Sequence, residues 1–256
     1  MMTTLSTQVQ SAYEKQYEDN QAEWREMGAR KKALNILELT QGLKFRSVLE
    51  VGAGDGSILQ QLSEHRFADE LYAVEISGSA LQRIQHRNIS QLKQSVLFDG
   101  YTIPFENNSF DLVILSHVLE HVEFERRLLR ELMRVAPVQL IEVPKDYRFG
   151  VDKKVKHFLS YGHINMYTPS SLRFLLKSEG FTIMKEKVDL YSRETYQFMY
   201  SKPAVEKKSA TTSIKADGLY LFKKLLLSIP FPQVRDHFAN TITVLTSSGK
   251  ENIDIF

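Results

Sequence analysis

The stretch LEVGAGDGSILQQL, from Leu49 to Leu62, decides the fold of this chain. An apolar run ends at Gly52, two more glycines follow at alternate positions, Gly54 and Gly56, and the apolar spacing beyond them is that of an amphipathic helix. A strand, a glycine turn and a helix N-terminus together can hold an anion or a dipole, because the first N–H groups of a helix have no partner within the helix. The stretch therefore predicts a ligand site where a buried strand meets a helix.

Strand and helix patterns alternate on both sides of this turn. Short apolar runs predict strands at 47–52, 71–77, 95–100, 110–116 and 138–144, with helices at 78–88 and 121–135, and two later runs at 181–192 and 242–247 predict a final pair. Continuous apolar runs are typical of parallel strands that helices cover on both faces. The chain is therefore predicted to be an α/β protein with a doubly wound sheet of about seven strands, mostly parallel with an antiparallel last strand.

The remaining segments are predicted to surround this sheet within a single domain over 1–256. Residues 1–45 have helical spacing and predict an N-terminal helical cap, in which we expect two helices. The polar, basic and aromatic segment 145–167 predicts a long loop on the acceptor side of the site. Residues 193–236 predict a helical insertion between the last two strands.

Composition excludes several classes of function. The formal charge is +2, from 33 basic and 31 acidic residues mixed along the chain, so no basic stripe indicates a nucleic-acid partner. The absence of cysteine excludes disulfides, thiolate nucleophiles and zinc sites built from cysteine. The first residues do not have the pattern of a secretory signal, and no apolar run approaches the roughly 20 residues that span a bilayer. We expect a cytoplasmic protein without stable membrane insertion.

Polar side chains gather at the ends of the predicted strands. Glu50 precedes the glycine turn, Glu75 ends the second strand, Asp99 the third, and Ser116 and His117 the fourth. The carboxyl ends of neighbouring parallel strands form the crevice in which open α/β sheets bind ligands, and an acidic residue at the second of them suits the hydroxyls of a ribose. The spacing G-x-G-x-G differs from the G-x-G-x-x-G that binds the pyrophosphate of a dinucleotide.

These motifs, taken in order, resemble the class I S-adenosylmethionine-dependent methyltransferases, in particular the small-molecule group with E-x-G-x-G-x-G. The matching segments are LEVGAGDG, AVEIS, FDGYTIPFENNSFDLVILSHVLEHV, IEVP and GHINMYTPSSLRFLLKSEGF, within Tyr13 to Ser192. The resemblance implies a Rossmann-like fold and an enzyme that uses S-adenosylmethionine and releases S-adenosylhomocysteine.

The resemblance also implies a role for each site residue. The backbone of the glycine turn would approach the donor, Glu75 would hold its ribose, Asp99 and its neighbours its adenine, and Arg30 its carboxylate, while Tyr13 or Tyr17 would close the site. The implied cofactor-binding residues are Glu50, Gly52, Ala53, Gly54, Gly56, Glu75, Ile76, Asp99, Gly100, Tyr101, Ser116, His117, Arg30, Tyr17 and Tyr13.

Three histidines are candidates for the base that accepts a proton from the methyl acceptor: His121, His117 and His163. His117 and His121 are four residues apart and share a helical face if the helix begins that early. Each has an ordinary alternative, as a packed or hydrogen-bonding residue. No metal is expected, because the Asp-Asn-Asp cluster of magnesium-dependent catechol enzymes is missing.

Three functions remain open. The first is methyl transfer to a small-molecule acceptor, on oxygen in preference to nitrogen. The second is a cofactor-binding but non-catalytic regulatory or partner subunit. The third, a nicotinamide-dependent oxidoreductase, is disfavoured by the glycine spacing. A homodimer is possible under any of them.

Overall fold

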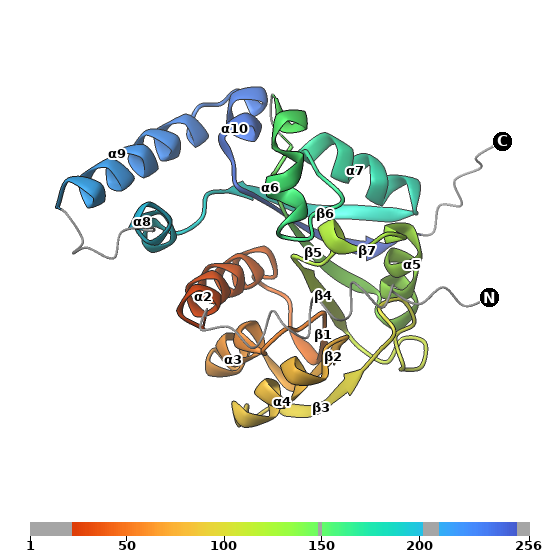
Figure 1. Ribbon diagram of the computed structural model, residues 1–256. Coiled ribbons are helices and arrows are strands. Elements are labelled where there is room, and N and C mark those ends of the chain that lie inside the picture. Colours follow the sequence, from red (N-terminus) through yellow and green to blue (C-terminus); the bar gives the residue numbers. More distant parts are fainter. Residues whose placement is uncertain (1–21, 148–149, 202–209, 250–256) are drawn as a thin grey trace.

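The computed structural model describes residues 22–147, 150–201 and 210–249, and these form a seven-stranded sheet with helices on both faces (Figure 1). The order of the strands is β3-β2-β1-β4-β5-β7-β6. Every pairing among β1 to β5 is parallel, whereas β7 is antiparallel to both β5 and β6. The predicted mixed sheet with an antiparallel last strand is confirmed.

The strands are β1 Phe45–Val51, β2 Ala68–Glu75, β3 Leu92–Leu97, β4 Leu112–Ser116, β5 Val138–Pro144, β6 Phe181–Asp189 and β7 Thr241–Ser248. The third strand lies earlier in the chain than the predicted 95–100. It is an edge strand whose residues are only partly buried, so a search for an apolar run misses its polar first half.

Two apolar layers fix the helices to the sheet. On one face α2 (Ala22–Leu39), α3 (Ser57–Glu64) and α4 (Gly78–His86) pack against side chains of β1, β2 and β4. On the other face α5 (Glu125–Val135) and α7 (Pro169–Ser178) pack against the alternate side chains of the same strands. Because successive side chains of a strand point to opposite faces, Val48 enters the first layer and Leu49 the second.

Several predicted helical segments need correction. The helix predicted at 121–135 begins at Glu125, after a separate 3₁₀ turn η1 (Leu119–His121). The segment 145–167 is not simply a loop, since it contains η2 (Val151–Lys154) and α6 (Val155–Leu159). The predicted insertion contains α8 (Arg193–Ser201), α9 (Ala210–Leu227) and α10 (Pro232–Phe238), which extend from the β6 side of the sheet (Figure 1).

Of the predicted N-terminal cap, α2 is confirmed as a helix, whereas the preceding helix predicted from the sequence, with Tyr13 and Tyr17, lies outside the described residues. Among the helices that the structure describes, none has the length and hydropathy to cross a bilayer.

The glycine turn between β1 and α3 requires glycine for two reasons. Gly52, Gly54 and Gly56 all have positive φ, at 70°, 57° and 77°. A Cβ atom on Gly52 would also lie 2.5 Å from Cγ2 of Val118. The backbone of the turn is therefore packed directly against the segment that follows β4.

Substituting Gly52 with Ala should destabilise the fold by about 2–4 kcal/mol, because the methyl group adds overpacking against Val118 to the strain of a positive φ. Gly42→Ala is the matched control: its φ is 89°, but no atom lies within 4 Å of the added carbon. The control should lose only about 1–2 kcal/mol. Urea unfolding of both variants measures the difference, and equal losses would contradict the close packing at Gly52.

Candidate active site

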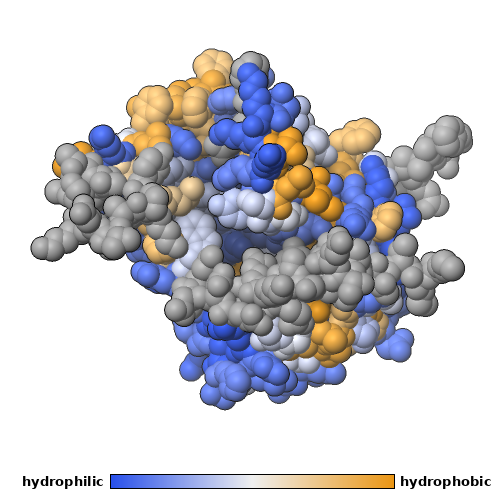
Figure 2. Space-filling model, viewed as in Figure 1, coloured by the Kyte–Doolittle hydropathy of each residue, from blue (hydrophilic) through white to orange (hydrophobic). Residues whose placement is uncertain are grey.

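A cavity of about 750 Å³ lies at the carboxyl ends of β1, β2, β4 and β5. Residues of α2 and α8 and of the segment around α6 complete its wall. Figure 2 shows a hollow with hydrophilic residues near the centre of this face. The position agrees with the rule that open α/β sheets bind ligands beyond the carboxyl ends of their strands.

The structure brings most of the predicted site residues together in this wall. They come from the ends of four strands, from the loops that follow these strands, and from the segment after α6. Those that line the cavity are Glu50, Gly52, Ala53, Gly54, Glu75, Ile76, Gly100, Ser116, His117, His121 and His163.

Glu75 connects the end of β2 to the glycine turn. Its Oε2 accepts a hydrogen bond of 2.7 Å from the Gly54 N–H, and its Oε1 accepts from the N–H groups of Ile76 and Ser77 at 2.8 and 3.1 Å. Glu75 also lines the cavity. Glu75 thus both orders the turn and faces the ligand space.

Four predicted residues do not line the cavity. Gly56 is the N-cap of α3, and the ring of Tyr101 is fully buried in the apolar core. Asp99 accepts hydrogen bonds from the backbone of Tyr101 and Thr102, which hold its pKa below the ordinary value against the opposing effect of burial. Arg30 is exposed, 4.0 Å from Glu194 of α8, and thus points away from the place predicted for it.

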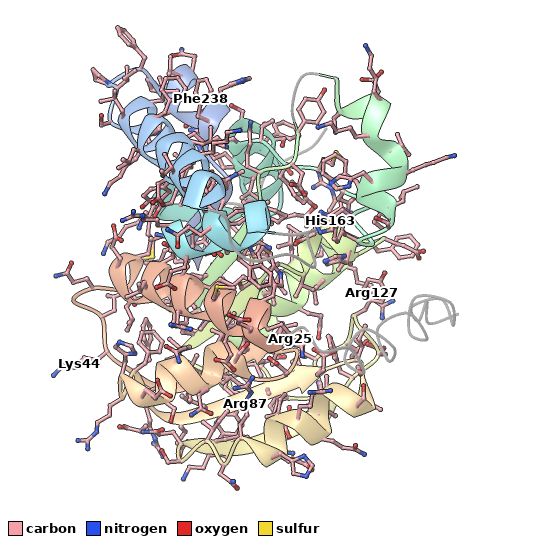
Figure 3. The ribbon with its side chains drawn as sticks, turned by 60° about the vertical axis from the view of Figure 1, so that its left-hand side comes forward. Arg25, Lys44, Arg87, Arg127, His163 and Phe238 are labelled. Atoms are coloured by element: carbon pink, nitrogen blue, oxygen red, sulfur yellow. The ribbon has the colours of Figure 1, made fainter. Side chains whose placement is uncertain are left out.

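An ionic cluster that the sequence pattern does not reveal joins α2, the glycine turn and the end of α4. Asp55 of the turn accepts from Arg25 Nε at 2.9 Å and from Arg87 Nη2 at 3.0 Å, and Arg87 also pairs with Glu26 at 2.6 Å. Figure 3 shows Arg25 and Arg87 approaching from these separate helices. Although burial opposes it, the two guanidinium groups lower the pKa of Asp55. The cluster fixes α2 against the turn.

Lys32 was also missed, and it lines the cavity beside buried acidic groups. One of these is Glu50, which is 1% exposed. Burial raises the pKa of Glu50 to about 8, with Asp55 and Glu75 adding to the effect and Lys32 opposing it. Glu50 is therefore mostly a neutral acid at pH 7.

His117 lies between two buried carboxylates. Its Nδ1 is 3.4 Å from Glu120 Oε1 and its Nε2 is 3.3 Å from Glu142 Oε1. Burial and Lys32 act to lower its pKa, but the two carboxylates outweigh them and raise it. The φ of His117 is 56°, so it belongs to a turn before η1, and the helix does not begin early enough for His117 and His121 to share a helical face.

His121 and His163 come together although they are distant in sequence. Their rings lie edge to face with centroids 4.8 Å apart. Burial lowers the pKa of His121, so its ring is neutral at neutral pH. Burial acts to raise the pKa of Glu120, but the neighbouring His117 and His121 outweigh it and lower the pKa to about 2. The structure therefore places two imidazoles and an ionised carboxylate on one side of the cavity.

Comparison with known proteins agrees with this arrangement. Residues 49–137 match the family described as "methyltransferase domain". A malonyl-[acyl-carrier protein] O-methyltransferase of Halorhodospira halophila is 33% identical over 91 residues, which are 35% of this chain and 31% of the relative. The chain spans only about a third to a half of the length of such curated relatives.

Two solved structures share the fold across most of the chain. A chain from the complex between the Haloferax volcanii Trm112 methyltransferase activator and a methyltransferase has a TM-score of 0.64 at 13% identity, covering 96% of this chain and 99% of that one. Phosphoethanolamine N-methyltransferase 2 of Haemonchus contortus, in complex with S-adenosyl-L-methionine, has a TM-score of 0.61 at 16% identity, covering 86% and 53%.

The strand order, the glycine turn and the cavity at the strand ends define a Rossmann-like protein of the ligand-binding α/β class. Within that class, residues 49–137 match the methyltransferase domain family, in agreement with the resemblance to the class I S-adenosylmethionine-dependent methyltransferases.

The raised pKa of Glu50 predicts a specific dependence of stability on pH. Between its ordinary pKa of 4.5 and about 8, the folded state keeps a proton that the unfolded state releases, so this group makes stability fall as pH rises through that window. Glu50→Gln removes the effect. The variant should gain stability over wild type from pH 5 to pH 8, by roughly 1–4 kcal/mol at the upper end. Urea unfolding at each pH measures the two stabilities. If the stability of the variant follows that of wild type in parallel across these pH values, the assignment is refuted.

Proposed function

We propose that this chain transfers the methyl group of S-adenosylmethionine to a small-molecule acceptor. The observation that carries the proposal is the position of Glu75, whose carboxylate orders the glycine turn and lines the cavity at the end of β2. At that place an acidic side chain suits the two hydroxyls of a ribose. Gly100, which also lines the cavity, is the proposed contact for the adenine.

Lys32 is the proposed partner of the donor's carboxylate, in place of the exposed Arg30. Of the lysine and arginine side chains in the described cavity wall, Arg25 pairs with Asp55 and Lys31 with Asp189. Lys32 forms no ion pair with any residue that the structure describes. A donor carboxylate would give this ammonium group a charged hydrogen-bond acceptor.

The remaining charges of the wall suit the cationic parts of the donor. S-adenosylmethionine has a sulfonium and an ammonium group, and Glu75, Glu120 and Glu142 bring carboxylates to the wall. Ser116 and His117, at the end of β4, are the proposed neighbours of the ammonium group. An acidic wall attracts a cation and does not hold the pyrophosphate of a dinucleotide, which supports methyl transfer over nicotinamide chemistry.

Methyl transfer requires alignment more than it requires catalytic side chains. The acceptor oxygen forms a bond to the methyl carbon while the carbon–sulfur bond breaks, and the electron pair of that bond stays on sulfur. The acceptor's proton leaves to a base or to water. The positive charge of the sulfonium disperses in the transition state, so a cavity that excludes water and aligns the reactants can supply much of the rate.

The acceptor is proposed to occupy the side of the cavity formed by α6 and α8. Aromatic and apolar side chains line this side, including Phe158, Tyr161, Phe198 and Met199, with polar groups from Asp146 and His163. A mainly apolar pocket with few polar groups is typical of small-molecule sites. We propose an acceptor that is partly apolar and is methylated on oxygen. The alternative function, a non-catalytic partner subunit, would bind the donor without turnover.

Calorimetry tests the donor site. S-adenosylmethionine and S-adenosylhomocysteine should both bind at micromolar concentrations. Nicotinamide adenine dinucleotide should not bind, because the glycine spacing of the turn differs from that of pyrophosphate-binding turns. Tight binding of the dinucleotide with no heat from the other two would exclude the proposed function. Turnover of radiolabelled donor with an acceptor panel then separates an enzyme from a non-catalytic subunit.

The substitution Lys32→Met should weaken binding of S-adenosylhomocysteine by about 10- to 100-fold, because a buried charged hydrogen bond to its carboxylate is lost. Arg30→Met is a matched control on the same helix and should change the affinity by less than about twofold, as its side chain is exposed. Calorimetric affinities of both variants decide between the two positions. If Arg30→Met lost much affinity and Lys32→Met lost none, the donor's carboxylate would be assigned to Arg30, the partner predicted from sequence.

A further inference from the structure

Three side chains with metal-binding groups meet on the acceptor side of the cavity. Glu120 and His121 come from η1. His163, labelled in Figure 3, comes from the segment after α6. One ligand atom from each lies within 4.8 Å of the other two. Glu120 is 1% exposed, and the side chains of the two histidines are 17% and 19% exposed.

The carboxylate of Glu120 is buried, and among the described residues its partners are two histidines at long range. His117 Nδ1 lies 3.4 Å and His121 Nε2 lies 3.8 Å from its Oε1. A buried carboxyl group ordinarily has close hydrogen-bond or metal partners, because leaving water without them costs free energy. A bound cation would supply what this site lacks.

The two histidine rings are oriented as metal ligands are. His121 Nδ1 is 3.0 Å from the carbonyl oxygen of Gly162, which can only accept, so Nδ1 carries the hydrogen. His163 Nδ1 is 2.6 Å from Asp146 Oδ2, and it likewise donates to that carboxylate. A metal ion would then bind Nε2 of each ring. Metal-binding histidines commonly donate their other N–H to a carbonyl or carboxylate in this way.

Backbone hydrogen bonds hold the two halves of the cluster together. The N–H groups of Ile164 and Asn165 donate to the carbonyl of Glu120 at 2.9 and 3.0 Å. The Asn165 side chain donates to the carbonyls of Leu119 and Val122 at 3.2 and 2.6 Å. The segment that presents His163 is thus anchored to both ends of η1, which presents Glu120 and His121.

We propose that Glu120, His121 and His163 bind one divalent transition-metal ion, such as Zn²⁺ or Mn²⁺. Two imidazoles and one carboxylate form a ligand set that these ions favour, and three protein ligands leave a coordination position open toward the cavity. Metal–ligand bonds of about 2.0–2.2 Å hold neighbouring ligand atoms about 3–3.5 Å apart, so the three side chains would draw together by small rotations.

This inference reverses the sequence-based expectation that no metal binds. Its role in catalysis rests on the proposed function: a cation on the acceptor side would favour loss of the proton from an acceptor hydroxyl, which supports methylation on oxygen. His121 and His163 would then be ligands of the ion, and not the bases predicted from sequence. Metal binding itself does not depend on the proposed function.

Calorimetry of the chelator-treated protein with Zn²⁺ and, separately, Mn²⁺ tests the site. Wild type should bind one equivalent of at least one of these ions, and His163→Ala and Glu120→Gln should each weaken that binding by at least about 100-fold. His157→Ala is the matched control: this histidine lines the same cavity, but its ring packs against Phe158 and Tyr161. The control should keep the wild-type affinity.

The substitution Asp146→Asn tests the orientation of His163 without removing a ligand. It should weaken metal binding by about 10- to 100-fold, and it should alter the visible absorption spectrum of the Co²⁺-substituted protein. Failure of wild type to bind either ion, or wild-type affinity in both His163→Ala and Glu120→Gln, would overturn the inference.

Affinity for S-adenosylhomocysteine, measured on each variant, shows that the donor side remains folded. It also separates the two proposals. Site-specific metal binding in a protein that does not bind S-adenosylhomocysteine would support the metal site and exclude the proposed methyltransferase function.

Discussion

The hydrogen bond from the Gly54 N–H to the Glu75 carboxylate is the interaction on which the site depends. It joins the end of β2 to a turn whose backbone has positive φ at alternate residues, and it does so at the wall of the cavity. The turn is held from two further sides, by Val118 against Gly52 and by the ionic cluster around Asp55. The ligand space is therefore bounded by backbone that cannot easily rearrange.

The cavity has two sides with different chemistry. Near the glycine turn the wall presents backbone groups, Glu75 and Lys32, which suit a ligand with both charges and hydroxyls. Another part of the wall holds the cluster of Glu120, His121 and His163, with the rings of Phe158 and Tyr161 beside His163. A donor and an acceptor placed on these two sides would meet where the strand ends converge. This division is the physical basis for proposing methyl transfer in preference to simple cofactor binding.

The sheet and the glycine turn were predictable because their signals are local. The apolar runs mark five buried strands, and the Gly52, Gly54 and Gly56 spacing marks the turn whatever packs around it. Strand β3 was displaced because an edge strand needs fewer apolar residues. The wall residues at the strand ends followed from topology alone, since parallel strands bring their carboxyl ends to one edge.

Features that depend on tertiary packing were not predictable. The apolar and polar residues of α2 are spread around the helix, so its sequence does not indicate that Lys32 and not Arg30 faces the cavity. The turn at His117 depends on a positive φ in a residue other than glycine. The pairing of His163 with Asp146, and the approach of both to η1, involve segments whose separation along the chain leaves no periodic signal.

A crystal structure of the protein with S-adenosylhomocysteine would test the central claim most directly, because it locates the ligand as well as detecting it. We expect the ribose hydroxyls on Glu75, the adenine beside Gly100 and the carboxylate on Lys32, with the sulfur directed toward the part of the wall that holds His163. A ligand bound elsewhere, or bound here with its ribose away from Glu75, would contradict the claim.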